Sequence, residues 1–206
     1  MQKTIQARLA RIISLLCGLG FNTLFAPYAF GFLETRLEEA QQSEFFTWFH
    51  LEQTDTTQDG QGHAIITFKP EGEKFRAWTT VNVTVGKHNQ VLAMELILAR
   101  SFIEDRRDGI FARDIAKSFL RAALSQEDHK AITDLVNEIE YPQDLMILPL
   151  TARQVEVQLP ATPTPGYRTF LGQQPAYTQT LSRSMLRLEN RKGDSGELLL
   201  ISLQKK

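Results

Sequence analysis

The chain has 206 residues, with 23 Lys or Arg against 24 Asp or Glu, and therefore a formal charge of −1 at pH 7. Nucleic-acid binding normally shows as a basic excess or stripe, so this charge balance argues against a nucleic-acid partner. The only cysteine, Cys17, lies near the N-terminus, so the remainder of the chain can form no disulfide and no thiolate metal site.

The first 31 residues predict an export segment. Lys3, Arg8 and Arg11 make the start basic, and residues 12–31 contain no charged side chain. A basic start, an apolar run and small residues at its end are typical of a secretory signal. The charge asymmetry places the N-terminus in the cytoplasm and the following chain across the membrane. We therefore expect a periplasmic or extracellular protein.

Three fates are open for this segment. Ala29 and Gly31 suit cleavage after Gly31, which would leave 175 residues with a formal charge of −4. Twenty uncharged residues could instead span a bilayer and remain as an anchor, and the membrane would then be a partner only through residues 1–31. Residues 12–30 could also be a buried helix. The polar Asn22 in the second half favours export with cleavage.

Residues 32–206 predict a single α+β domain, an antiparallel sheet of about six strands with a helical pair packed on one face. Apolar residues from Leu33 into the forties recur at helical spacing, and we expect a helix there. Its end is ambiguous, because the aromatic cluster at residues 45–49 fits a strand equally well. That cluster could line an apolar groove, although core packing is the more usual role. Residues 53–62 are polar and predict a loop.

The next strands show clear alternation. Residues 63–69 predict a short strand, and residues 75–85 alternate apolar and polar side chains over eleven positions. Arg76 and Trp78 fall on the polar face of that segment. Apolar residues at alternate positions from 92 to 98 predict the return strand of a long hairpin.

Two helices follow the hairpin. Residues 108–124 carry an apolar stripe with charged residues opposite, and Ser125 predicts the N-cap of a second helix that ends at Tyr141. The acidic residues between the hairpin and the first helix suit capping. The adjacent Arg106 and Arg107 could instead pair with acidic groups of a partner.

The last third of the chain returns to strands. Residues 155–159 alternate, whereas three prolines predict an extended segment over 160–166 that lies outside any central strand. Residues 176–190 and 197–203 flank a glycine-containing turn and predict a second hairpin.

Four residues are candidates for a binding site: Arg76, Trp78, Arg183 and Arg187. Trp78 has polar neighbours on its predicted face, so it needs either the helical pair or a ligand against its ring. Arg183, Arg187 and Arg191 share one face of a strand, where guanidinium groups could hold a carboxylate or phosphate bidentately. A solvent-facing strand explains the same pattern, because long charged side chains discourage edge pairing.

No motif predicts a cofactor, and the one partial metal motif is weak. Residues 55–60 place oxygen ligands at alternate positions before a glycine, as calcium loops do. However, Thr57 replaces an acid, and Ile66 stands where the closing glutamate would be. We therefore expect no metal site and a simple polar connection.

The pattern favours a non-catalytic exported module that binds a protein partner or an apolar small molecule between its sheet and helices. A second hypothesis is an enzyme with dispersed carboxylates and histidines. Its best candidate is Glu95, an acid within an apolar run, which would need His50, His63 or Arg76 beside it in a cleft. A third is a structural subunit tethered by its N-terminal segment and paired through an exposed strand edge.

Overall fold

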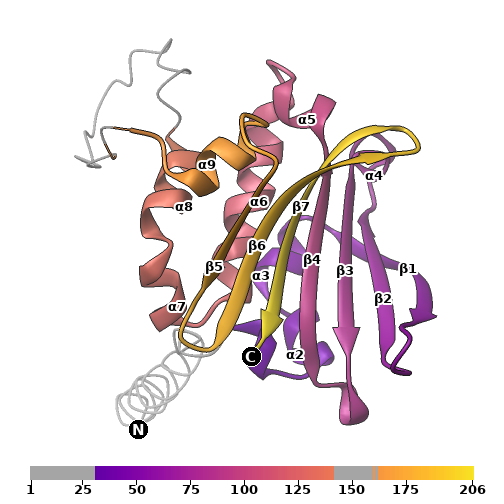
Figure 1. The fold of residues 1–206 in the computed structure, drawn as a ribbon. Coiled ribbons are helices and arrows are strands. Elements are labelled where there is room, and N and C mark those ends of the chain that lie inside the picture. Colours follow the sequence, from indigo (N-terminus) through magenta and orange to yellow (C-terminus); the bar gives the residue numbers. More distant parts are fainter. Residues whose placement is uncertain (1–30, 142–159, 161) are drawn as a thin grey trace, which may run out of the picture.

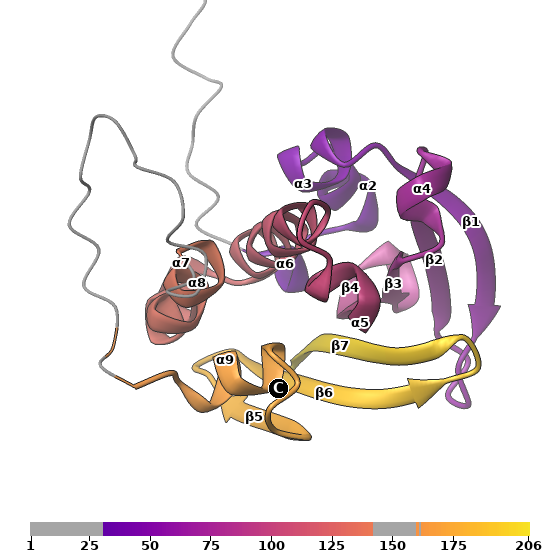
Figure 2. The same ribbon diagram turned by 90° about the horizontal axis from the view of Figure 1, so that it is seen from above.

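The computed structural model describes residues 31–141, 160 and 162–206. These residues form a seven-stranded antiparallel sheet in the order β1-β2-β3-β4-β7-β6-β5. Helices cover one face of the sheet (Figure 1), and the sheet curves around them when seen from above (Figure 2). The prediction of an α+β fold with an antiparallel sheet is confirmed. The predicted export segment lies outside the described residues, apart from Gly31.

The strands are β1 (Leu51–Gln58), β2 (Ala64–Pro70), β3 (Thr79–Val85), β4 (Val91–Ala99), β5 (Ala176–Thr180), β6 (Ser184–Gly193) and β7 (Gly196–Lys205). The helices are η1 (Phe32–Glu34), α2 (Leu37–Gln41), α3 (Glu44–Trp48), α4 (Glu73–Arg76), η2 (Lys87–Asn89), α5 (Arg100–Glu104), α6 (Gly109–Ala123), α7 (Gln126–Ala131), α8 (Thr133–Glu140) and α9 (Pro165–Phe170). None of these helices, in the described part of the chain, is long and apolar enough to cross a membrane.

Period-two alternation decides which face of the sheet is covered. In β3, Val81 and Val83 are fully buried, whereas Asn82 between them is half-buried. Their register partners in β4 are Leu96 and Met94, which are buried in the same core. The helices therefore lie against the apolar side of the strands, and the polar side faces outward.

Two strands depart from the sequence prediction. The polar segment at 53–62 was expected to be a loop, yet most of it belongs to the edge strand β1. An edge strand with both faces exposed needs no apolar alternation, so the pattern could not identify it. The single strand expected at 176–190 is two strands, β5 and β6, with the buried Leu181 in the turn between them. The strand expected at 155–159 lies outside the described residues.

The segment before β3 is a turn of helix rather than strand. The backbone N–H of Phe75 donates to Gly72 O at 3.0 Å and that of Trp78 donates to Phe75 O at 3.1 Å, which forms α4 and the turn after it. The prediction that Arg76 and Trp78 share a strand face is therefore wrong. The alternation over residues 75–78 does not reflect a strand. These residues follow the turn at Pro70–Gly72 and belong to α4 and the turn after it.

The helix expected from residue 33 is three short helices, η1, α2 and α3. Ser43 has extended backbone dihedrals and starts α3, where its Oγ accepts the N–H of Phe46 at 3.5 Å. Ser125 caps α7 as predicted, accepting the N–H of Asp128 at 3.2 Å. The predicted second helix is interrupted at Ile132, which separates α7 from α8.

The helix α9 begins inside the segment that was expected to be extended. Pro165 occupies its first turn, where a missing N–H costs nothing, and Thr164 Oγ1 accepts the N–H of Tyr167 at 3.2 Å. The buried carboxylate of Glu138 in α8 accepts the N–H of Thr164 at 2.9 Å. This contact joins α8 to α9.

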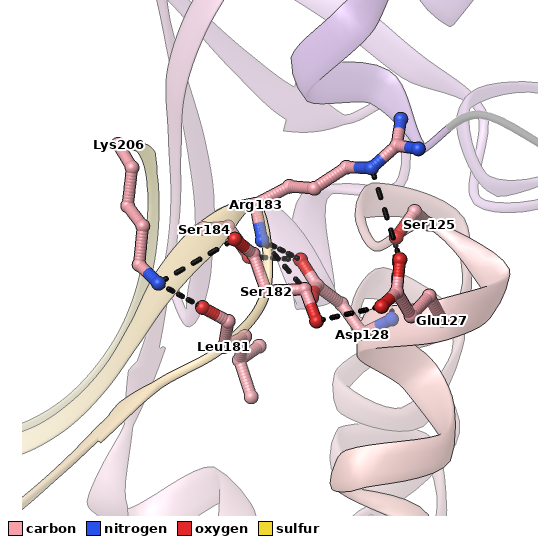
Figure 3. A network of polar contacts seen from close by, with 8 residues as sticks. All are labelled: Ser125, Glu127, Asp128, Leu181, Ser182, Arg183, Ser184 and Lys206. Carbon is pink, nitrogen blue, oxygen red and sulfur yellow. Dashed lines mark hydrogen bonds and ion pairs between the residues drawn. The ribbon is translucent and has the colours of Figure 1, made fainter.

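A buried carboxylate joins α7 to the β5–β6 turn (Figure 3). Asp128 is 1% exposed, and Ser184 Oγ donates to its Oδ2 at 2.7 Å. The backbone N–H of Arg183 lies 3.2 and 3.3 Å from its two oxygens. The exposed Glu127 accepts from Ser182 at 2.9 Å on the outer side of the same turn.

His129 makes the stability of α7 sensitive to pH. Its Nε2 is buried and has no hydrogen-bond partner among the residues that the structure describes. Burial, with a smaller effect from Arg121, lowers the pKa of its imidazole below 6.5. The neutral ring is therefore favoured in the folded state. Its contribution to stability is complete above pH 6.5 and decreases as the pH falls below that value.

We expect urea unfolding to show a smaller loss of stability between pH 7.5 and 5.5 in H129L than in the wild type, because leucine cannot titrate. Carboxylates titrate in both proteins, so the difference between the two pH profiles isolates His129. Parallel profiles would contradict a role for this ring.

Candidate functional site

An apolar groove opens at the end of the sheet where β2 ends and β3 begins. It has a volume of about 500 Å³ and lies between the sheet and the helices α3, α4, α5 and α6. Figure 2 looks down on this end of the molecule. Most of the lining is apolar or aromatic, and its principal side chains are Trp48, Phe49, Phe75, Phe102, Phe111 and Ile115.

The short helix α3 divides its aromatic residues between the core and the groove. Phe45 and Phe46 are buried, with ring centroids 5.5 Å apart in an edge-to-face arrangement. Trp48 lies two residues beyond Phe46, about 200° around the helix axis, and is 78% exposed. Phe49 is half-buried and lines the groove. Phe45 and Phe46 therefore pack in the core, whereas Trp48 and Phe49 line the groove.

The opposite wall is an aromatic group contributed by α4, α5 and α6. The ring centroid of Phe75 lies 5.8 Å from that of Phe102 and 5.2 Å from that of Phe111. Phe111 and Ile115 are four residues apart and so share one side of α6. Ile115 is buried, whereas Phe111 is 52% exposed at the rim.

Three lining residues are polar. The backbone N–H of Glu71 donates to His50 O at 3.0 Å, which joins the start of β1 to the end of β2. His50 takes up a left-handed backbone conformation, with φ of 45°. No side chain among the described residues forms a hydrogen bond or ion pair with the side chain of His50 or Glu71. These two groups and Thr79 are therefore the polar contacts that the groove offers a ligand.

Two of the predicted site residues lie beside the groove without lining it. Arg76 Nη1 lies 3.4 Å from Glu52 Oε2, an exposed ion pair. Trp78 stacks on Phe102 with ring centroids 5.4 Å apart, so α5 covers its ring rather than the predicted helical pair. The remaining two, Arg183 and Arg187, lie in the β5–β6 turn and in β6, so the four candidates do not form one site.

The arginine row of β6 is paired within its own strand. Arg187 Nη2 and Arg191 Nη2 lie 2.7 and 2.9 Å from Glu189 Oε2. The hydrogen bond from Arg191 holds the pKa of the Glu189 carboxyl below its usual range. Arg183 Nε lies 4.0 Å from Glu127. The pairing of these three arginines fits a solvent-facing strand better than a site that binds a carboxylate or phosphate.

Glu95 lies on the outward face of the sheet, away from the helices. Its carboxylate accepts from Asn82 Nδ2 at 3.3 Å and from Ser202 Oγ at 3.1 Å. Thr67 Oγ1 continues the row by donating to Asn82 Oδ1 at 3.0 Å. The hydrogen-bond donors to Glu95 are thus Asn82 and Ser202, and the arginine that interacts with it electrostatically is Arg191, not the Arg76 that the enzyme hypothesis named.

The weak calcium motif at residues 55–60 forms the end of β1 and the start of the turn into β2. Asp59 Oδ1 accepts the N–H groups of Gln61 and His63 at 2.8 Å. The His63 backbone N–H contributes most to lowering the pKa of the Asp59 carboxyl. Within the described residues, no group of three or more His, Cys, Asp or Glu is placed to hold a metal ion.

Sequence reasoning missed three aromatic residues of the groove. Phe75 was assigned to a strand, Phe111 to a buried stripe, and Phe102 to no element. The sequence did hold one indication that Phe111 could be exposed. Ile110 and Phe111 are adjacent apolar residues in the first turn of α6, where an apolar residue has less core to contact, and the structure shows both of them exposed.

No protein-family model matches the chain, and neither the curated proteins nor the solved structures include a significant match.

Proposed function

We propose that the chain is an exported, non-catalytic module that binds an apolar small molecule in the groove between its sheet and helices. The observation that carries the proposal is the aromatic lining of a groove of about 500 Å³. That volume lies in the range of sites for drug-sized ligands, which are mostly apolar with a few polar groups. His50 and Glu71 supply such groups at one side.

Exposed aromatic surface provides a driving force for binding. Trp48 and Phe111 stand at the rim with more than half of each side chain in water. Complete burial of a large apolar side chain contributes about 1.5–3 kcal/mol. A ligand that covers even part of both rings therefore gains a favourable hydrophobic contribution before any polar contact forms.

The alternative hypothesis of a structural subunit that pairs through an exposed strand edge has less support than ligand binding in the groove. β1 is an edge strand with seven exposed residues, which would suit a partner strand. However, it carries the charges of Glu52 and Asp55 and a register shift between Gln53 and Asp55. Charges and bulges on an edge are features that oppose pairing.

Export forms part of the proposal and rests on the basic start and apolar run of residues 1–31. We expect the protein recovered from its host's envelope fraction to have a mass beginning at Phe32. A full-length mass in the same fraction would indicate a retained anchor. Full-length protein confined to the cytoplasm would contradict export.

The groove can be tested with a neutral apolar fluorophore, N-phenyl-1-naphthylamine, titrated against the purified full chain. We expect F111D to weaken its binding at least about 10-fold, because the substitution removes an aromatic contact and places a carboxylate in the groove. Phe111 is half-exposed, so the substitution should leave the fold intact, as circular dichroism can check.

Ile110 offers a matched control for this measurement. It precedes Phe111 in α6 and is 56% exposed, yet it does not line the groove. We expect I110D to bind the fluorophore within about 2-fold of the wild type. An equal loss in both variants, or no binding by the wild type, would overturn the proposal.

A further inference from the structure

The mouth of the groove carries the most exposed large apolar side chains of the described part of the chain. Trp48, Ile110 and Phe111 are 78%, 56% and 52% exposed, and they come from α3 and the start of α6. Figure 2 shows α3 next to α6. Trp48 and Phe111 line the same groove, and Ile110 precedes Phe111 in α6 without lining it. Exposed apolar side chains gathered in this way mark an interaction surface rather than scattered exposure.

A pair of basic side chains stands next to this apolar surface. Arg106 and Arg107 lie in the turn between α5 and α6, three to four residues before Ile110, and both are exposed. The described residues include no ion-pair partner for either guanidinium group. Guanidinium groups recognise phosphate through paired N–H donors, so the turn complements a phosphate-bearing surface.

The acids of the same turn are engaged within the protein. Asp105 Oδ1 accepts the backbone N–H groups of Arg107 and Asp108 at 2.7 and 2.8 Å, and these bonds lower the pKa of its carboxyl. Asp108 pairs with Lys74 Nζ at 2.7 Å. Both carboxylates are thus held by donors of the turn and of α4. The charge of Arg107 contributes a smaller part to lowering the pKa of Asp105, and both arginine side chains are exposed.

Apolar aromatic side chains with basic neighbours suit the interface of a phospholipid bilayer. Tryptophan is enriched at the level of the headgroups, and the apolar side chains around it can enter the acyl boundary. Phe111 belongs both to this exposed surface and to the groove wall. An acyl chain that enters at the mouth would therefore meet a continuous apolar path from the bilayer into the groove.

We propose that the mouth of the groove docks on a phospholipid membrane surface and that the groove takes up an acyl chain of a membrane lipid. This inference rests on the proposed function of the groove, and it adds the source and the chemical class of the ligand. Trp48, Ile110 and Phe111 contact the acyl boundary, and Arg106 and Arg107 contact the phosphates.

Trp48 provides a local readout of docking. The chain has two tryptophans, so the variant W78F leaves Trp48 as the only one. Because residues 1–31 contain no tryptophan, its emission reports the mouth and not an insertion of the N-terminal segment. With vesicles of phosphatidylcholine and phosphatidylglycerol, we expect the emission of the full chain to shift to shorter wavelength.

Three variants in this background separate docking from ligand binding. I110D should abolish the vesicle-induced shift while leaving the affinity for N-phenyl-1-naphthylamine unchanged. Replacing Arg106 and Arg107 by glutamine should weaken binding to the anionic vesicles roughly 5-fold for each arginine. M185D, a charge introduced at an exposed methionine of β6, should change neither measurement.

The two proposals fail separately. Fluorophore binding without any vesicle-induced shift would overturn membrane docking and leave the proposed function standing. If the wild type does not bind the fluorophore, both the proposed function and the membrane proposal are overturned. A shift of Trp48 emission that rises with protein concentration in the absence of vesicles would assign the mouth to a second copy of the chain and overturn the membrane proposal.

Discussion

Replacement of Asp128 by alanine should lower the free energy of unfolding by about 3 kcal/mol, which corresponds to a fall in Tm of roughly 6–12 °C for a chain of this size. The carboxylate is 1% exposed and accepts from Ser184 Oγ and the backbone N–H of Arg183 (Figure 3). Its removal leaves the Ser184 hydroxyl in a buried position without its acceptor. Urea unfolding followed by circular dichroism measures the loss.

Glu127 is the matched control, since it is the preceding residue of α7 and also contacts the β5–β6 turn. Its side chain is 63% exposed, and its ion pair with Arg183 is 4.0 Å long. We expect E127A to cost less than about 1 kcal/mol, because exposed pairs are screened by water.

A double-mutant cycle identifies the interaction responsible. The losses in D128A and S184A should not add, because both variants break the same 2.7 Å hydrogen bond. Additive losses would show that Asp128 acts through its helix or its packing instead. A loss in E127A as large as that in D128A would contradict the importance of burial.

The sequence predicted the fold where one apolar pattern dominates. Val81 and Val83 alternate with polar residues because one side of β3 is core, and that alternation predicted the strand, although it placed the start at residue 75 rather than at Thr79. β1 has no buried face, so its threonines and glutamines read as a loop. The turn at Leu181 was missed because a buried leucine inside a polar run resembles the strand on either side of it.

The groove was less accessible to sequence reasoning, because its residues come from four helices that only tertiary packing brings together. Trp48 and Phe49 belonged to a conspicuous aromatic cluster, and one interpretation placed them in a groove. Phe75 and Phe102 are 27 positions apart in the sequence, with no shared pattern. The proximity of their rings follows from the path of β3 and β4, which returns the chain from α4 to α5.

Two buried arginines flank α9 with different partners. Arg100 Nη1 donates to Phe170 O at 2.5 Å, and its Nη2 donates to Thr169 O at 3.5 Å and to Asn190 Oδ1. Burial lowers the pKa of this guanidinium from its usual value, although it remains charged at neutral pH. Arg113 instead donates to Tyr167 Oη at 3.0 Å, and its guanidinium lies 5.6 Å from the Phe170 ring centroid.

R100M should lower the free energy of unfolding by about 3 kcal/mol. The carbonyl of Phe170, the last residue of α9, accepts from Arg100, and the cation at this end also offsets the negative end of the helix dipole. Removing the buried charge recovers part of its desolvation cost, but Phe170 O and Asn190 Oδ1 lose their donor. Thr169 O keeps the N–H of Gly172 at 3.0 Å and Asn190 Nδ2 at 2.9 Å. Urea unfolding measures the net effect.

R113M should cost only about 1 kcal/mol, because it removes one hydrogen bond to a phenol and a cation–π contact while methionine retains much of the packing. R100K tests the role of the planar group: one ammonium cannot reach three separate oxygens, so we expect a loss between those of R100M and R113M. Equal losses in R100M and R113M would mean that both arginines act through their buried alkyl stems, and would contradict the assignment of Arg100 as the donor that closes the end of α9.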